Sequence, residues 1–293
     1  MDSSSMDSHA EHAARIFHRC PICHTALSPS RIVVAEGPLL ECPNCGQLVS
    51  GCNTDQYHAA LQMWNTAHGT SPQPRAVRRY REVVTRRLRK AEQLLGHRAG
   101  MKLLDVGCSS GALLAIAKDM GFEVRGVEPA REAAQTAIRA GFQVHEGYLS
   151  DARYSDDQFD IITLFEIVEH LRDPIELVAE CARILKPGGI LVVNTPNAHS
   201  WSAETLGGQW EGFSLFGLGG HISFFSPRSM GELARRSGLA VEWIETRNVR
   251  LTEDKSSPVK YRALKILGQL LAYPARIATK GHDLLVYFRK PGK

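Results

Sequence analysis

The chain has no long apolar run. None of its uninterrupted apolar stretches reaches the roughly 20 residues that a membrane-spanning helix requires. The polar start from Met1 to His9 also lacks the apolar core of a secretory signal peptide. We therefore expect a cytoplasmic protein without a membrane-spanning segment.

A strong net charge is also absent. The formal net charge is +4, which is too mild to indicate nucleic acid binding on its own. With 293 residues, of which 43% are hydrophobic and 23% are charged, the chain can form one large globular domain and one small one. There are seven cysteines. Disulfides are rare in the cytoplasm, so cysteines that occur in pairs favour a metal site.

Four of the cysteines form two CxxC pairs near the start of the chain. A short strand-forming segment separates the pairs, so the four thiolates can surround one zinc ion tetrahedrally, and closed sites of this kind are structural. We predict a disordered start over residues 1–18 and a zinc ribbon over 19–52. The expected ligands are Cys20, Cys23, Cys42 and Cys45.

A linker and a basic helix are predicted over residues 53–98. The stretch 53–73 is polar and ends in a Ser-Pro-Gln-Pro sequence, which suits a linker that folds back over a cofactor. Arg75 to Arg98 has apolar residues at helical spacing and many arginines between them. The arginines form a solvated face or, alternatively, bind an acidic or phosphate-bearing partner.

The stretch from Lys102 to Gly111 predicts a cofactor site. Its consecutive apolar residues are typical of a buried parallel strand, and Gly107 and Gly111 allow a tight turn into the next helix. Such turns bind nucleotide cofactors, but Asp105 at the strand end would repel a phosphate. It suits a cationic ligand such as S-adenosylmethionine, although it can also simply cap the turn.

A second acid supports the same kind of ligand. The strand Phe122 to Val127 is followed by Glu128, about 20 residues beyond the glycine turn, where an acid reaches the ribose hydroxyls of a nucleoside. Strands and helices then alternate up to Asn194, which predicts a doubly wound parallel α/β sheet. The segment Glu166 to Leu171 follows the fourth strand and should face the same crevice.

Four motifs carry a family resemblance. LLDVGCSSG, VEP, QFDIITLFEIVEHLRDP and ILKPGGILVVNTPN resemble the class I S-adenosylmethionine-dependent methyltransferases over residues 101–197. The resemblance implies a Rossmann-like, seven-stranded sheet. It also implies that Gly107 and Gly111 lie against the amino acid end of the cofactor, Glu128 binds its ribose and Phe165 lies beside the sulfonium. The CSSG turn departs from the family, in which glycines are commoner.

Within this group, FEIVEHL is similar to the corresponding stretch of ubiquinone-biosynthesis O-methyltransferases. The resemblance implies that Glu166, Glu169 and His170 bind a divalent metal near the acceptor hydroxyl. Their offsets of three and four would place them on one face of a helical turn, and Mg²⁺ prefers carboxylates. Alternatively, His170 is a general base without a metal, or Glu169 and His170 only cap and position the helix.

The C-terminal half offers a cover and an insertion. Residues 197–225 are rich in glycine and aromatics and can exclude water from the site; His221 in this stretch contacts the acceptor or is a structural histidine. Residues 255–281 form a basic amphipathic insertion interrupted by Pro274. This pattern suits a helix that lies on an anionic membrane surface, or one that packs on the domain.

Together these features predict a methyltransferase domain over residues 99–293 behind a zinc ribbon. The expected reaction is O-methylation of a small-molecule, glycan or lipid-linked acceptor. An RNA base methyltransferase is the first alternative, because a zinc ribbon before this fold resembles some ribosomal RNA guanine enzymes. The ribbon lacks interleaved basic and aromatic residues, however, so nucleic acid is not expected as the partner. The second alternative is a non-catalytic binding module, which predicts no cofactor binding.

Overall fold

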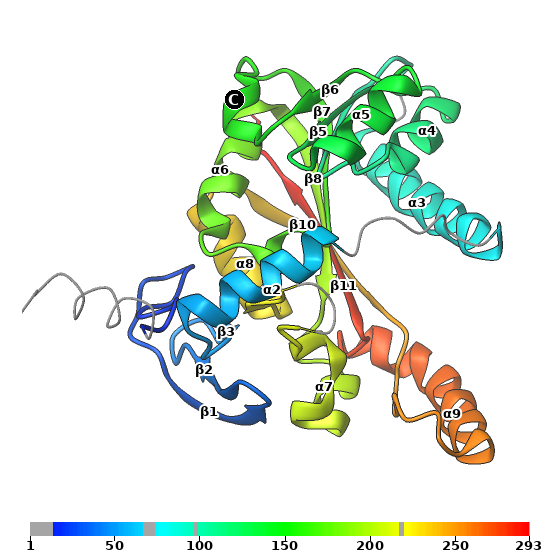
Figure 1. Cartoon of the computed structure of the whole chain (residues 1–293). Coiled ribbons are helices and arrows are strands. Elements are labelled where there is room, and N and C mark those ends of the chain that lie inside the picture. The colour runs from blue at the N-terminus through cyan, green and yellow to red at the C-terminus, as the bar shows by residue number, and fades with distance from the viewer. Residues whose placement is uncertain (1–13, 67–73, 97–98, 217–219, 293) are drawn as a thin grey trace, which may run out of the picture.

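Two β-sheets organise the protein. The computed structural model describes residues 14–66, 74–96, 99–216 and 220–292 (Figure 1). The larger sheet has seven strands in the order β10-β11-β8-β7-β4-β5-β6, which confirms the predicted seven-stranded, Rossmann-like α/β architecture. Its strands are β4 (Lys102–Val106), β5 (Glu123–Glu128), β6 (Val144–Glu146), β7 (Phe159–Phe165), β8 (Leu185–Pro196), β10 (Ala240–Arg247) and β11 (Asp283–Arg289).

The sheet is mixed: the strands up to Asn194 are parallel, as predicted, and an antiparallel strand is added beyond them. Strands β4 to β8 are parallel to one another, whereas β11 runs antiparallel to both β8 and β10. The chain leaves β10 at Arg247 and re-enters the sheet at Asp283, and these two residues are paired in the register. Because β11 begins where β10 ends, it must run in the opposite direction.

Helices cover both faces of this sheet. Figure 1 shows α3, α4 and α5 on one side and α6 and α8 on the other. The predicted apolar face of the basic helix is confirmed at Val84, Leu88 and Ala91, which are fully buried in the core between α3, α4 and the sheet. The bounds are α3 (Pro74–Leu95), α4 (Ala112–Asp119), α5 (Arg131–Arg139), α6 (Pro174–Ile184) and α8 (Pro227–Arg236).

The smaller sheet belongs to the ribbon but takes its last strand from the larger domain. Its order is β1-β2-β3-β9. In the last pair Leu48 lies opposite Phe224 and Val49 opposite Ser223. The four ribbon cysteines pack in the same core as Phe225. The ribbon is therefore built onto the larger domain. Its strands are β1 (Ser28–Val34), β2 (Gly37–Glu41), β3 (Leu48–Val49) and β9 (Ser223–Phe224).

Several sequence-based boundaries change. Residues 1–13 of the predicted disordered start lie outside the described residues. The prediction is wrong for the rest of that start, because Ile16 and Phe17 are buried and Arg15 bridges to Asn53. The predicted linker contains helix α2 (Thr54–Thr66).

Part of the segment 197–225, which was predicted to cover the site, belongs to the hydrophobic core. Trp210 and Phe213 are buried and meet edge to face, with ring centroids 4.7 Å apart. The indole Nε1 of Trp210 donates a hydrogen bond to Nδ1 of His282 at 3.2 Å. These aromatics thus fix the segment to the domain. The short helices in and around this region are α7 (Trp201–Leu206), η3 (Gly207–Gln209) and η4 (Glu211–Phe213); η1 (Leu149–Ala152) and η2 (Val168–His170) lie earlier in the chain.

Helix α9 (Pro258–Ile277) occupies the predicted insertion and projects from the sheet (Figure 1). Only Gly268 and Ala275 of this helix are buried, so it does not pack along its length on the domain. Among the described residues, no helix is long and apolar enough to cross a membrane.

Candidate functional site

The turn after β4 requires glycine at two positions. Gly107 and Gly111 have φ values of 75° and 86°, which residues with a side chain rarely adopt. A Cβ atom at Gly107 would also lie 2.4 Å from Cδ1 of Ile167. The amides of Gly107 and Cys108 donate to the carbonyl of Val127 at 2.8 and 3.1 Å, which fixes the turn against the end of β5. Glycine at these positions thus permits both the left-handed backbone and the packing of Ile167 against the turn.

Glu128 lies at the carboxyl end of β5, beside this turn, where the sequence placed it. Its Oε2 accepts a hydrogen bond from the amide of Ser109 at 2.8 Å, and its Oε1 accepts one from the amide of Ala130 at the same distance. Each carboxylate oxygen keeps further capacity to accept, so ribose hydroxyls can also bind here.

Asp105 is buried inside the sheet. Its Oδ1 accepts a hydrogen bond of 2.6 Å from the hydroxyl of Thr163 on β7, so its side chain is bonded to the neighbouring strand and not to the turn. Burial raises the pKa of Asp105 to about 7, the Thr163 hydrogen bond opposes this rise, and the charge of Glu128 adds to it. A cation placed nearby would favour the charged carboxylate.

The segment after β7 bends sharply at Glu166. Glu166 has a φ of 56°, a rare value for a residue with a side chain, and its amide donates to the carbonyl of Asn194 at 2.9 Å. Just before it, the ring of Phe165 lies under the guanidinium of Arg87 from α3, 4.8 Å from the ring centroid. The face of Phe165 therefore contacts a cation of the protein itself, and its place beside the sulfonium stays a prediction.

Glu169 is a fully buried carboxylic acid. Neither of its carboxylate oxygens has a hydrogen-bond partner of ordinary geometry within the described part of the chain. Burial raises the pKa of Glu169 well above its usual value, and the negative charge of Glu166 raises it further. Such a group must be protonated or neutralised by a cation, because a buried lone charge is costly.

Two histidines lie beside Glu169. The rings of His170 and His221 meet edge to face with centroids 4.9 Å apart. Nδ1 of His170 lies 3.3 Å from the carbonyl of Gly220, and Nδ1 of His221 lies 3.1 Å from that of Gly212. A carbonyl only accepts, so each Nδ1 is the donor, and in the neutral ring Nε2 keeps a lone pair. Burial lowers the pKa of His221, which favours the neutral ring.

This arrangement differs from the predicted magnesium site. One ligand atom each from Glu169, His170 and His221 lie within 4.8 Å of one another, whereas Glu166 is exposed and outside the group. The offsets were expected to place Glu166 on one helical turn with the other two, but η2 begins only at Val168. One carboxylate and two imidazoles are a poor match for Mg²⁺, which prefers oxygen ligands. The fold brings His221 here from a distant loop, so spacing within one motif could not reveal it.

The ribbon cysteines match a zinc site. All four are buried, and their sulfur atoms lie within 4.8 Å of one another. The Sγ atoms of Cys20 and Cys45 are 3.5 Å apart, those of Cys23 and Cys42 are 3.3 Å apart, and those of Cys23 and Cys45 are 3.6 Å apart. Tetrahedral Zn–S bonds of about 2.3 Å imply sulfur separations of about 3.8 Å, so the four thiols are nearly in place.

Comparison with known proteins identifies relatives of the larger domain. Residues 76–243, more than half of the chain, match the family model described as a methyltransferase domain. A ubiquinone biosynthesis O-methyltransferase of Thiobacillus denitrificans is 33% identical over 155 residues, which cover 49% of this chain and 66% of that protein. The protein of the same name from Alkalilimnicola ehrlichii is 30% identical over 190 residues, covering 58% of this chain and 76% of that protein. The match thus spans just under two thirds of the first relative.

Solved structures show the same fold. An S-adenosylmethionine-dependent methyltransferase from Archaeoglobus fulgidus superposes with a TM-score of 0.52 at 22% identity, over 72% of this chain and 94% of that one. A chain from the Haloferax volcanii complex of the Trm112 methyltransferase activator with a methyltransferase gives 0.51 at 21% identity, over 73% and 94%.

Proposed function

The chain belongs to the methyltransferase domain family, and from this premise we propose that it methylates an oxygen of a small-molecule, glycan or lipid-linked acceptor with S-adenosylmethionine as donor. The observation that carries this proposal is the cluster of Glu169, His170 and His221, whose ligand atoms lie within 4.8 Å of one another. Ile167 of the same segment packs against Gly107, which brings the two halves of the site together.

The donor side of the site is assigned to the carboxyl edge of β4 and β5. In this proposal the turn that Gly107 and Gly111 allow lies against the amino acid end of the donor, and Glu128 accepts hydrogen bonds from its ribose hydroxyls. Asp105 adds negative charge below the turn, which favours a cationic ligand over a phosphate-bearing one. Phe165 lies beside the sulfonium in this proposal, and its contact with Arg87 supports a cation at its face.

The acceptor side is assigned to the buried cluster. S-adenosylmethionine supplies a methyl group on positively charged sulfur, and sulfur leaves as a neutral thioether. As the acceptor oxygen bonds to the methyl carbon, the carbon–sulfur bond breaks and its electron pair stays on sulfur, while the hydroxyl proton must be removed. We assign this proton to Nε2 of His170, because Nδ1 is engaged by the carbonyl of Gly220. The ring of His221 packs edge to face against that of His170 and helps to orient it, and Glu169 lies beside both rings.

Calorimetry tests the donor site directly. The wild type should bind S-adenosylmethionine, and Glu128→Ala should weaken binding about tenfold or more through loss of the ribose hydrogen bonds. Glu146→Ala is the matched control, because Glu146 lies opposite Glu128 in the register on the next strand. A wild type that does not bind the donor would overturn the proposal. Methyl incorporation into catechols, sugars and RNA then identifies the acceptor class.

We further propose that α9 rests on an anionic membrane surface. The helix has four Lys or Arg residues and no Asp or Glu. An apolar stripe runs along it, and Leu270, Tyr273 and Ile277 in this stripe are 71%, 72% and 70% exposed. Exposed apolar side chains flanked only by cations match an interfacial helix that is attracted to anionic lipid. A lipid-linked acceptor would be reached from such a position.

Vesicle co-sedimentation tests this contact. The protein should sediment with vesicles of phosphatidylglycerol and phosphatidylcholine but not with phosphatidylcholine alone. Leu270→Asp with Ile277→Asp should abolish sedimentation, whereas Val33→Asp, at an equally exposed apolar position on the ribbon, should not. Equal sedimentation of all three proteins would refute the contact.

A further inference from the structure

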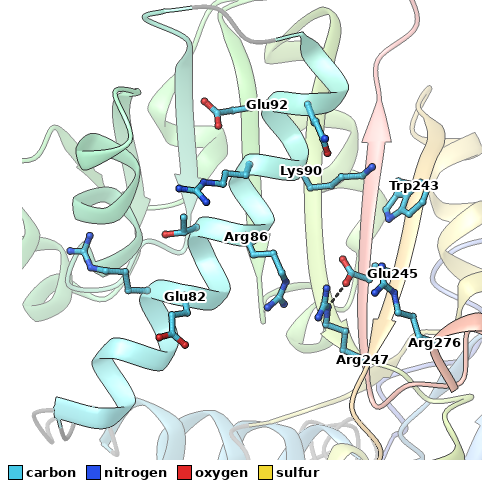
Figure 2. A pocket seen from close by; sticks show the side chains of 12 residues that line it. Glu82, Arg86, Lys90, Glu92, Trp243, Glu245, Arg247 and Arg276 are labelled. Atoms are coloured by element: carbon cyan, nitrogen blue, oxygen red, sulfur yellow. Dashed lines mark hydrogen bonds and ion pairs between the residues drawn. The ribbon is translucent and has the colours of Figure 1, made fainter. Parts of the chain in front are cut away.

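A second hollow lies between α3 and the edge of the large sheet. It is a cavity of about 890 Å³ that is lined by residues of α3 and β10 and by one residue of α9. Figure 2 shows side chains from α3 on one wall and Trp243, Glu245 and Arg247 from β10 on the other, with Arg276 from the end of α9 beside Glu245. We call this cavity the α3–β10 groove.

The groove has an excess of positive charge. Six of its lining residues are cations and three are acids. The cations are Arg81, Arg86, Arg89, Lys90, Arg247 and Arg276, and the acids are Glu82, Glu92 and Glu245. Since the chain as a whole carries only +4, this is a local concentration and not the average surface.

Half of these cations are already engaged. Arg81 pairs with Asp119 at 2.9 Å, and Arg247 pairs with the buried Glu245. The ammonium of Lys90 lies over the ring of Trp243, 4.0 Å from its centroid. These contacts fix the walls of the groove in one geometry.

The other three arginines, Arg86, Arg89 and Arg276, have no ion-pair partner in the described part of the chain. The Nε of Arg86 is buried and has no hydrogen-bond partner there, which is uncommon for a buried donor. Burial lowers the pKa of Arg86, and the positive charge of Arg247 nearby lowers it further. The cations therefore repel one another, and an anion bound between them would relieve this repulsion and satisfy the donor.

We propose that the α3–β10 groove binds the phosphate groups of a phosphorylated ligand through Arg86, Arg89 and Arg276. Guanidinium groups recognise phosphate with paired hydrogen bonds, and three arginines that line one cavity suit two adjacent phosphates better than one carboxylate. The site is distinct from the methyl-transfer crevice, because Arg86 faces the groove whereas its neighbour Arg87 contacts Phe165 in the crevice. The proposal does not depend on the identity of the donor.

Trp243 provides the readout, because it lines the groove and is 42% exposed. Titration with inorganic pyrophosphate should change the tryptophan fluorescence of the full-length protein, and added NaCl should weaken this binding. Trp243→Phe should remove the signal while calorimetry still detects pyrophosphate. Arg86→Ala and Arg276→Ala should each weaken binding about tenfold. Arg139→Ala, an exposed arginine on α5, is the matched control and should have no effect.

Two arms distinguish the source of the phosphate. If it comes from a lipid headgroup, pyrophosphate should compete with anionic vesicles for the protein, and Arg86→Ala should weaken vesicle binding although Arg86 is not on α9. If the phosphate belongs to a soluble compound, neither added pyrophosphate nor Arg86→Ala should change vesicle binding. Absence of pyrophosphate binding in the wild type, or binding that both arginine variants retain in full, would overturn the proposal. Donor binding by Arg86→Ala, measured separately, reports on the methyl-transfer site alone.

Discussion

Asp105 offers a test in which stability and ligand binding should move in opposite directions. Its carboxyl group is buried and its pKa is raised from 3.8 to about 7, mainly by loss of solvent. The folded protein therefore loses stability as the pH rises from the unfolded pKa to the folded one, because the carboxyl ionises more readily in the unfolded chain. Well below pH 3.8 the carboxyl is protonated in both states, so its burial costs no stability through ionisation there.

The size of this effect follows from the two pKa values. One pKa unit is worth about 1.4 kcal/mol, so the ionised Asp105 costs the folded state about 4 kcal/mol above pH 7. Asp105→Asn has no charge to bury, and its amide oxygen can still accept from Thr163. The free energy of unfolding of the variant should therefore exceed that of the wild type, and this gap should widen by about 3 kcal/mol between pH 5 and pH 8.

Urea unfolding at several pH values measures the gap. Thr163→Val is the companion variant, because the Thr163 hydrogen bond lowers the pKa of Asp105, and its removal should extend the loss of stability to higher pH. Donor binding should weaken in Asp105→Asn, since the charge beside the cationic ligand is gone. A gap that stays constant with pH would refute the burial argument. A stabilised variant with unchanged donor affinity would refute the assignment of Asp105 to the donor.

Four other outcomes are expected. The purified protein should contain about one zinc ion per chain, and Cys42→Ser should lose it in elemental analysis; zinc-free wild type would contradict the ribbon site. Gly107→Ala should lower the thermal midpoint, because its methyl would lie 2.4 Å from Ile167 and a left-handed backbone costs about 1 to 2 kcal/mol; adding Ile167→Ala should restore only the part due to the clash. His170→Ala should reduce turnover about 10² to 10⁴-fold with donor affinity retained, and a smaller loss would assign the proton to another group. Mg²⁺ added after EDTA treatment should not raise turnover, and a rise would support a role for Mg²⁺ in the reaction.

The parts of the structure that depend on neighbouring residues were predictable from the sequence. The strand before the glycine turn was expected at Leu103 to Val106 and is observed at Lys102–Val106. Glu128 was expected at the end of the next strand and ends β5. Both follow from local patterns of apolar residues and glycines, which need no knowledge of distant contacts. The four cysteines share this property, because the spacing of each pair alone favours a common metal.

The features that the sequence did not reveal depend on contacts between distant segments. His221 joins Glu169 only because a later loop folds back over η2. The reversal of β11 depends on where α9 returns the chain to the sheet. The exposure of α9 could not be predicted either, because a packing helix and an interfacial helix have the same amphipathic pattern. In each case the residues fit two arrangements, and tertiary contacts select one.

One of those contacts links the ribbon, with its four cysteines, to the candidate catalytic site. The amide of Ser50, just after β3, donates to the carbonyl of Ile222 at 2.8 Å, and the amide of Ile222 donates to the carbonyl of Glu169 at 2.9 Å. Ile222 follows His221 directly and precedes β9, which pairs with β3. The edge of the ribbon sheet is thus used to hold the backbone beside Glu169 and His221. Loss of zinc should loosen β3, and through Ile222 it should disorder the acceptor side of the site before the donor side, which rests on β4 and β5.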